Sequence, residues 1–375
     1  MKNVGIGFFI LVLISFSFFS FFYIDSNLIY FKNLYTGIAL TNRFAATFLY
    51  ILFIIVLFAL YLWFITKYRE KKLFSKDVKN IIIAASLILL PSYPAMLSFD
   101  IFNYIATAKV LFFYHENPYI IMPIEFVGDK LLLFTHAANK IALYGPVWTV
   151  LSGLPHAMGL GNFILTLYAF KLFTLAFYIG TFVMLYKISR DWYRVVLFAL
   201  NPLVLIETLV SSHNDIIMMF FALCAFYFLS KKKILFACLF IFLSILIKYA
   251  TLFLLPVFIY TLVKTLQKKT INWEKVYFFA ALSMFLIFLL SPIREEIYPW
   301  YGQWFLPFIA LLPKKKWLVG FGIAISSGLL LRYLPYMYFG TYSHPTPFIK
   351  MVVTIVPLMV LLLFFVLYYA LKKKI

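Results

Sequence analysis

Long apolar runs, separated by short polar and basic segments, recur along the whole chain. An α-helix needs about twenty apolar residues to cross about 30 Å of hydrocarbon, whereas strands of a membrane barrel show about ten residues of alternating polarity. The pattern therefore predicts an all-α polytopic membrane protein with about 12 (roughly 11 to 13) transmembrane helices. We expect them at 4–24, 44–66, 80–97, 163–187, 193–210, 214–230, 234–249, 250–266, 276–291, 300–313, 317–335 and 350–371.

The composition supports this class. Of the 375 residues, 65% are hydrophobic and 12% are charged, more apolar surface than a soluble domain of this size could bury. Cys224 and Cys238 lie inside apolar runs and form no disulfide or metal pattern. No small-residue cleavage pattern follows the first run, so we expect an uncleaved first helix.

The net charge of +20 lies in short Lys and Arg clusters between apolar runs, as topology signals do, and we expect no nucleic-acid partner. With the N-terminus in the cytoplasm, the alternation of spans puts 23 of the 33 basic residues and both termini there. The composition, rich in Phe, Ile, Lys and Tyr, suggests a prokaryotic plasma membrane. The outer face receives Lys32, Arg43, Lys109, Lys130, Lys140, Arg294, Arg332 and Lys350, while Lys171 and Lys248 lie inside spans.

The same charge count decides the doubtful segment 146–160. If this segment crossed the membrane, every later basic cluster would move to the outer face, against the positive-inside tendency. We therefore expect it to lie along the membrane surface or dip into it. The consequence is one long outer segment, 98–162, and long loops tend to carry function.

Asp100 stands where the third predicted helix leaves the membrane and opens an amphipathic segment that includes Tyr104. A carboxylate at a hydrocarbon boundary is poorly solvated, which favours a role as a base. An N-cap for the following helix is the alternative role.

Further polar residues are predicted on the same face. The turn 211–215 contains His213, Asn214 and Asp215, and Glu207 lies about one helical turn deeper. A carboxylate inside the membrane is costly and marks a candidate functional site. For Asp215, capping of the next helix remains an alternative.

Isolated cations at one membrane depth suggest an anion at that depth, such as a lipid phosphate. Lys248 and Arg332 lie at the outer ends of their predicted spans, although snorkelling to the interface would also place them there. For Lys171, snorkelling is the favoured reading. The aromatic residues Trp300 and Tyr301 fit either an interfacial belt or a surface on which a sugar stacks.

Five segments together resemble the GT-C glycosyltransferases, more narrowly the prokaryotic mannosyltransferases that depend on polyprenol-phosphate-mannose. The resemblance runs in order from Asp100 to Pro307 through FDIFNYIATAKVLFFYHENPY, YGPVWTVLSGLP, NPLVLIETLVSSHND, LIKYATLFLLP and YPWYGQWFLP. It implies transfer of a sugar, with mannose expected, from a polyprenyl-phosphate donor to an acceptor hydroxyl on the extracytoplasmic face. The acceptor is a glycan, a glycolipid or a protein.

The resemblance also assigns roles to residues. It implies that Asp100 is the catalytic base, and Lys248 and Arg332 would bind the donor phosphate. A single displacement inverts the anomeric centre and needs no second carboxylate as nucleophile. The candidate substrate-binding residues are Tyr104, Asn117, Tyr119, Tyr144, Trp148, Glu207, His213, Asn214, Asp215, Trp300 and Tyr301.

Two departures from the family pattern qualify the resemblance. Many GT-C sequences place a second acidic residue beside the first, whereas here Phe99 and Ile101 flank Asp100, so we expect no metal and no other cofactor. The long loop follows the third span instead of the first. We therefore expect one membrane domain, in which 1–79 add a helix pair, 80–310 form the catalytic core and 311–375 form C-terminal helices.

The sequence is also compatible with two other functions. A transporter or flippase for a lipid-linked saccharide would use the same cations and aromatic surfaces without chemistry, and a non-catalytic subunit of an envelope-assembly complex is a third possibility. A transporter needs polar groups along a whole transmembrane path. The embedded charges at Lys171, Glu207, Lys248 and Arg332 all map to the outer half, which favours a one-sided site.

Overall fold

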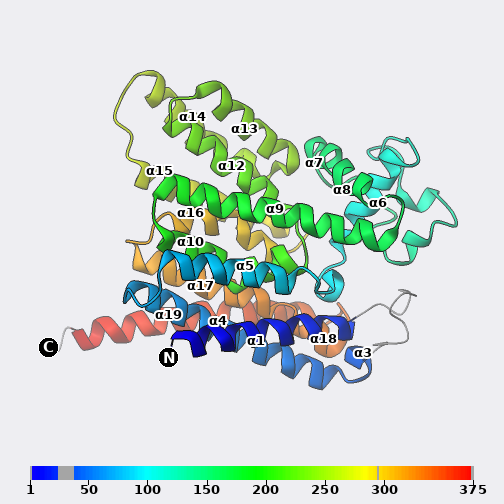
Figure 1. Cartoon of the computed structure of the whole chain (residues 1–375), viewed down its shortest axis with the longest axis horizontal. Helices are drawn as coiled ribbons and strands as arrows, with labels where there is room; N and C mark the ends of the chain where they lie inside the picture. The colour runs from blue at the N-terminus through cyan, green and yellow to red at the C-terminus, as the bar shows by residue number, and fades with distance from the viewer. Residues whose placement is uncertain (1, 24–37, 294, 373–375) are drawn as a thin grey trace.

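The structure, a computed structural model, describes residues 2–23, 38–293 and 295–372. Within these ranges every regular element is helical, and the long helices run side by side along one direction (Figure 1). The bundle contains α1 (Lys2–Ser20), α4 (Arg43–Arg69), α5 (Ser75–Leu89), α9 (Phe163–Ser189), α12 (Asp215–Ser230), α13 (Ile234–Ile247), α14 (Leu255–Leu266), α15 (Trp273–Leu290), α17 (Lys316–Leu331) and α19 (Thr346–Lys372).

Seven helical segments of the described chain are long and apolar enough to cross a membrane. The number becomes eight if α10 (Trp192–Ala199) and the segment Pro202–Val210, bent by 63° at a break, form one span. The shorter apolar helices α12 and α13 do not reach this length. The predicted all-α membrane class is thus supported by several apolar helices, whereas the predicted number of about 12 spans is not confirmed.

The expected span 300–313 is broken. Its residues form η9 (Pro299–Trp304), a 3₁₀-helix, and the five-residue α16 (Leu306–Ala310). Proline lacks a backbone donor and stops a regular helix, and Pro299 and Pro307 stand near the starts of these two elements. Nearly all of the segment is buried, as broken backbone at membrane depth must be.

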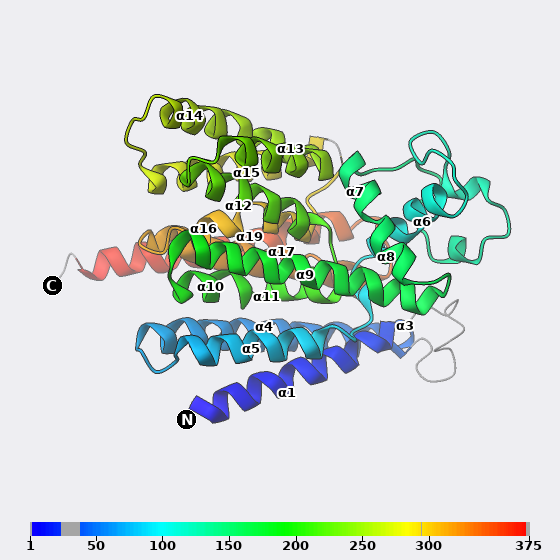
Figure 2. The ribbon, with the colours of Figure 1, turned by 45° about the horizontal axis from the view of Figure 1, so that its top comes forward.

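The segment 98–162 contains only short helices: α6 (Asp100–Phe112), η4 (Pro123–Glu125), η5 (Lys130–Leu133), α7 (Pro146–Leu151) and α8 (Gly153–Met158). The helices α7 and α8 have six residues each, about 9 Å of length, so 146–160 cannot form a full span. Helices α6, α7 and α8 gather at the end of the bundle away from both termini (Figures 1 and 2). Which side of the membrane this end faces stays a prediction.

Several of the basic clusters lie at the opposite end of the bundle, where their side chains contact neighbouring helices. Lys2 forms a salt bridge of 2.7 Å with Asp77, Lys79 lies 5.1 Å from the ring centroid of Trp192, and Lys315 pairs with Glu274. These contacts link the clusters that the sequence assigns to one face. The predicted positions Lys32, Arg294, Lys373 and Lys374 lie outside the described residues.

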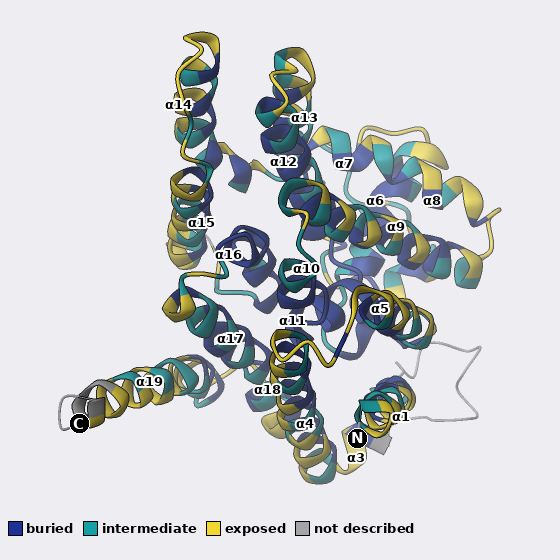
Figure 3. Cartoon of the chain, turned by 60° about the vertical axis from the view of Figure 1, so that its left-hand side comes forward, coloured by how far each residue is buried: buried dark blue, intermediate teal, exposed yellow. Residues whose placement is uncertain are grey.

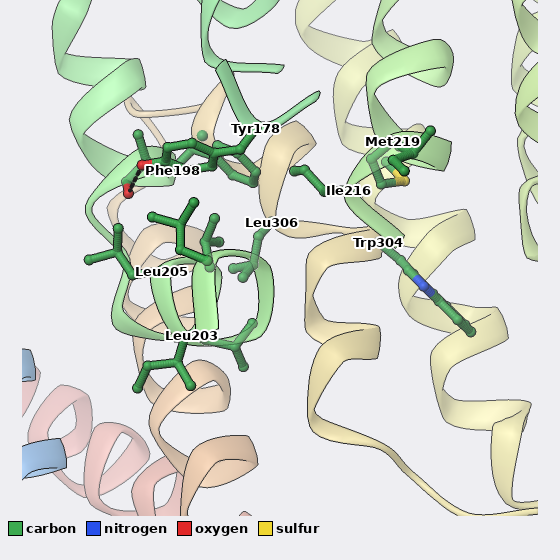
Figure 4. Packing of buried hydrophobic residues seen from close by; sticks show 14 of the residues in the cluster. Tyr178, Phe198, Leu203, Leu205, Ile216, Met219, Trp304 and Leu306 are labelled. Atoms are coloured by element: carbon green, nitrogen blue, oxygen red, sulfur yellow. Dashed lines mark hydrogen bonds between the residues drawn. The ribbon is translucent and has the colours of Figure 1, made fainter. Parts of the chain in front are cut away.

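The centre of the bundle is formed by α10, α11 (Pro202–Leu205), η6 (Ile206–Val210) and α12, which are mostly buried (Figure 3). Figure 4 shows how side chains of these elements pack with Tyr178 of α9 and with Trp304 and Leu306. By contrast, apolar side chains on the outer faces of α4, α15 and α19 are exposed. Apolar side chains that cover the outer surface as well as the core are expected where lipid hydrocarbon, not water, surrounds the helices.

Lys171 is an exception to the apolar centre. Its side chain is buried, and its Nζ donates hydrogen bonds to the carbonyls of Ser92 at 2.5 Å, Val210 at 3.2 Å and Leu89 at 3.5 Å. The expected snorkelling is therefore wrong for this residue, because its ammonium group satisfies carbonyls at the ends of α5 and η6.

Candidate active site

A cavity of about 480 Å³ opens where the start of α6, the end of α13 and the end of α15 meet the segment 298–304. Five predicted site residues line it: Asp100, Tyr144, Lys248, Trp300 and Tyr301. The other lining residues are Asn103, His136, Ala137, Lys140, Leu143, Gly145, Tyr249, Ala250, Ile287, Leu290, Ser291, Glu295, Tyr298 and Trp304.

Asp100 is the first residue of α6, and the N-cap position belongs to Phe99. The capping alternative thus does not describe this carboxylate. Its side chain is 23% exposed, and its Oδ2 lies 3.5 Å from Nδ1 of His213. Asp100 consequently faces the cavity while it contacts a buried imidazole.

The segment 206–213, which packs against Asp100 through His213, has an irregular backbone. Residues Ile206–Val210 form a π-helix, a rare element found often at functional sites, and Ser212 has a positive φ of 59°, which costs about 1 kcal/mol or more for a residue with a Cβ. This turn places the imidazole of His213 with Nε2 at 3.3 Å from Oε2 of Glu207. His213 therefore bridges two carboxylates.

The His213 ring is held by stacking. It lies 3.9 Å from the ring of Trp300 at an interplanar angle of 16°, and Trp300 stacks on Tyr298 at 4.6 Å. Burial lowers the pKa of His213, but Asp100 and Glu207 outweigh burial and raise this pKa to about 9. The imidazole is charged at neutral pH.

Lys248 directly follows α13 as its C-cap residue and lines another part of the cavity. Its Nζ donates to Oδ1 of Asp215 at 2.9 Å and lies 4.9 Å from the ring centroid of Tyr301. The indole of Trp304 donates to the same carboxylate oxygen. Asp215 is the first residue of α12, and the N-cap position belongs to Asn214, so the Asp215 carboxylate orients Lys248 instead of capping the helix.

The Tyr144-Gly145 pair is packed against the end of α13. The amide of Gly145 donates to the carbonyl of Ile247 at 3.0 Å, and a Cβ at Gly145 would lie 2.1 Å from the carbonyl oxygen of Leu246. Only glycine permits this approach, which brings Tyr144 and Lys248 into one cavity wall.

Several predicted substrate-binding residues lie behind the cavity lining. His213 contacts Asp100, Glu207 contacts His213 from the other side, and Asp215 contacts Lys248. The hydroxyl of Tyr104 donates to Oδ1 of Asn214 at 3.3 Å. The structure thus brings these residues to the site as support for the lining side chains.

Four other predicted residues are not brought into the cavity. Arg332 donates to the carbonyl of Lys350 and to Thr354, so it joins α17 to α19 and does not accompany Lys248. Asn117 accepts a hydrogen bond from the Tyr119 amide, and the Tyr119 hydroxyl donates to the carbonyl of Tyr144. Trp148 is buried, with its ring 4.9 Å from that of Tyr104.

The cavity also contains residues that the sequence did not single out. Lys140 supplies a second cation, and Asn103, His136, Glu295, Tyr298 and Trp304 complete the polar and aromatic lining. Tyr298 and Trp304 belong to the YPWYGQW segment already quoted, which offered a signal. His136 and Lys140 carry no motif, and their only signal was their position in the long loop 98–162.

Buried polar atoms without hydrogen-bond partners gather around the same turn. Within the described chain they include Oγ of Ser211 and Ser212, Nδ2 of Asn214, Oδ2 of Asp215 and Nε2 of Gln303. Such atoms are rare in native structures, and a catalytic or ligand-binding role is one explanation for a group of them. No group of three or more His, Cys, Asp or Glu residues suited to a metal occurs in the described part of the chain.

The family described as alpha-(1->6)-mannopyranosyltransferase, N-terminal domain, matches residues 5–264. The chain belongs to this family. Comparisons with curated proteins and with solved structures gave no match.

Membership in this alpha-(1->6)-mannopyranosyltransferase family confirms the resemblance to mannosyltransferases and is consistent with a GT-C-like enzyme. It supports glycosyl transfer with mannose and favours an enzyme over the transporter alternative. The matched range contains most of α1 and all of α4, together with Asp100, the π-helix and Lys248. Segment 298–304, which supplies the stacked aromatic residues, lies beyond it.

Proposed function

We propose that the protein transfers a mannosyl group from a polyprenyl-phosphate donor to an acceptor hydroxyl in this cavity, with inversion and with Asp100 as general base. The observation that carries the proposal is the position of Asp100: it is a partly exposed carboxylate in a cavity that also holds Lys248 and an aromatic wall. The acceptor is a glycan, a glycolipid or a protein.

The base must reach the acceptor hydroxyl. A hydroxyl is a weak nucleophile until a positioned carboxylate takes its proton in the transition state. Glu207 and Asp215 are fully buried and engaged by His213 and Lys248. Of the carboxylates that line the cavity in the described chain, Glu295 is the alternative base, but it lies on an exposed loop, whereas Asp100 begins a helix.

The leaving group is an anion attached to a lipid. The acceptor oxygen bonds to the anomeric carbon as the bond from that carbon to the phosphate oxygen breaks, the proton passes to Asp100, and polyprenyl phosphate departs. Lys248 and Lys140 line the cavity and would stabilise the phosphate charge. Ile287, Leu290 and Ala250 give the same cavity an apolar part suited to the lipid.

The proposed side of the membrane follows from charge. The cavity lies at the end of α15 that holds Leu290, whereas Glu274 at the start of α15 pairs with the basic cluster 314–316. Because basic clusters favour the cytoplasm, we place the active site on the extracytoplasmic face of the membrane.

The test supplies purified, reconstituted protein with membrane-extract acceptors and with radiolabelled mannose on one of two donors. One donor carries the mannose on polyprenyl phosphate, and the other carries it on a nucleoside diphosphate. We expect transfer only from the lipid donor, with an inverted anomeric configuration in the product. Transfer from the nucleotide donor alone, or a retained configuration, would refute the proposal. Glu295→Gln is a parallel arm, and loss of transfer in this variant alone would move the base from Asp100 to Glu295.

A further inference from the structure

The buried imidazole behind Asp100 has a role that direct substrate contact does not explain. We infer that His213 is a positioning residue, which bridges Glu207 and Asp100 and holds the Asp100 carboxylate toward the cavity. This inference rests on the proposed function of Asp100.

The bridge uses both ring nitrogens. Nδ1 lies 3.5 Å from Asp100 Oδ2, and Nε2 lies 3.3 Å from Glu207 Oε2. A neutral imidazole has one N–H donor, whereas the charged ring has two. Neither contact meets hydrogen-bond geometry, so the bridge is an electrostatic one, and a carboxylate oxygen within ion-pair distance of each nitrogen suits the imidazolium form.

The far end of the bridge is anchored. The hydroxyl of Tyr333, which lies between α17 and α18 (Leu334–Phe339), donates to Glu207 Oε1 at 2.9 Å, and the amide of His213 donates to the carbonyl of Glu207 at 3.0 Å. Stacking on Trp300 fixes the plane of the ring. Glu207 and His213 thus form a fixed support, and Asp100 is the member of the chain that faces the cavity.

The charged groups nearby are paired with other partners, so the His213 imidazolium faces two carboxylates, those of Asp100 and Glu207. Asp215, the next acidic residue along the chain, is paired with Lys248. Lys171, from α9, directs its ammonium group to backbone carbonyls, including that of Val210. Tyr333 donates its hydroxyl to Glu207, and Trp300, on which Tyr298 stacks, covers the face of the His213 ring.

A positioning role and a substrate-binding role predict different kinetics. His213 is fully buried and does not line the cavity, so its loss should lower kcat and leave the KM for donor and acceptor nearly unchanged. A displacement of the base by about 1 Å can lower the rate roughly 100-fold. Because the pKa of His213 is raised to about 9, the wild-type rate should fall at alkaline pH as the imidazolium loses its proton.

The experiment measures kcat, KM and the pH profile of mannosyl transfer for wild type, His213→Gln, Glu207→Gln and Tyr333→Phe. For His213→Gln we expect kcat to fall about 10- to 100-fold, with KM within about twofold and no alkaline decline attributable to this residue. For Glu207→Gln, the removal of one carboxylate should move the alkaline decline to lower pH. Tyr333→Phe removes only one hydroxyl and should lower kcat by less than His213→Gln does.

Controls separate folding and the base itself from the positioning effect. His115→Asn removes another histidine from an exposed loop, where Asn tolerates the positive φ of 57°, and should behave as wild type. Unchanged kcat in His213→Gln, or a large rise in KM with unchanged kcat, would overturn the inference while leaving Asp100 as the base. Full activity of Asp100→Asn would instead overturn the proposed function. If His213→Gln does not fold, unchanged pH profiles in Glu207→Gln and Tyr333→Phe would overturn the inference.

Discussion

Gly145→Ala adds a single methyl group at the contact that joins the long loop to α13. The backbone of Gly145 has φ −69° and ψ 162°, which alanine adopts without strain, so the effect of this substitution is steric. The new Cβ would lie 2.1 Å from the Leu246 carbonyl oxygen and 2.6 Å from its carbon. Both atoms belong to the backbone and cannot rotate away.

The magnitude follows from the distance. An ordinary contact begins at 3.4 Å, so the loop and α13 must separate by about 1 Å or more, a displacement that can lower the rate roughly 100-fold. This corresponds to about 3 kcal/mol of transition-state stabilisation. The separation also breaks the hydrogen bond from Gly145 to Ile247 and moves Tyr144 away from Lys248.

The assay compares kcat/KM for mannosyl transfer, together with the thermal unfolding midpoint, in wild type, Gly145→Ala and Gly7→Ala. Gly7 lies in α1, and a Cβ there would meet nothing within 4 Å, so Gly7→Ala controls for the change of residue type. We expect a loss of about 100-fold in kcat/KM only in Gly145→Ala. Wild-type kcat/KM in that variant would refute the role of this contact in shaping the cavity.

Three further predictions concern Lys248, Lys171 and His213. Lys248→Met removes a cation from the cavity and should lower kcat/KM for the polyprenyl-phosphate donor by about 100-fold, measured beside Arg332→Met, which should lower it far less. Lys171→Met leaves the carbonyls of Leu89, Ser92 and Val210 without their donor, so we expect a loss of about 1–3 kcal/mol in stability and a lower Tm at unchanged KM. The folded-state pKa of His213 is raised from 6.5 to about 9, so its stabilising contribution is complete below pH 6.5 and lost as the pH rises through 9. Tm should therefore decline over this window in wild type and less in His213→Gln.

The sequence located the main parts of the site because each lies next to a topological boundary. Asp100, Lys248 and the aromatic residues at 300–301 stand at predicted helix ends, and alternation of spans placed these ends on one face. The helix ends do meet at one cavity. The distribution of basic clusters along the chain was also sufficient to reject a span at 146–160, where two six-residue helices occur.

Other features depend on long-range packing, which periodicity does not encode. Arg332 and Lys140 were both assigned to the outer face, but only the fold shows that Arg332 binds the α19 backbone while Lys140 reaches the cavity. The π-helix at 206–210 shifts the register of Glu207 and turns His213 between two carboxylates. Its sequence reads as an ordinary apolar helix, so its supporting role could not be predicted.

The most direct measurement compares mannosyl transfer from polyprenyl-phosphate-mannose by wild type, Asp100→Asn and Glu116→Gln. Glu116 is an exposed carboxylate in the same segment of the chain and serves as the matched control. As general base, Asp100 should contribute about 100- to 10,000-fold to kcat, so Asp100→Asn should lose that activity while Glu116→Gln retains it, both with and without EDTA. Equal transfer by Asp100→Asn and wild type would contradict the assignment of the base, and loss of wild-type transfer in EDTA would contradict a metal-free reaction.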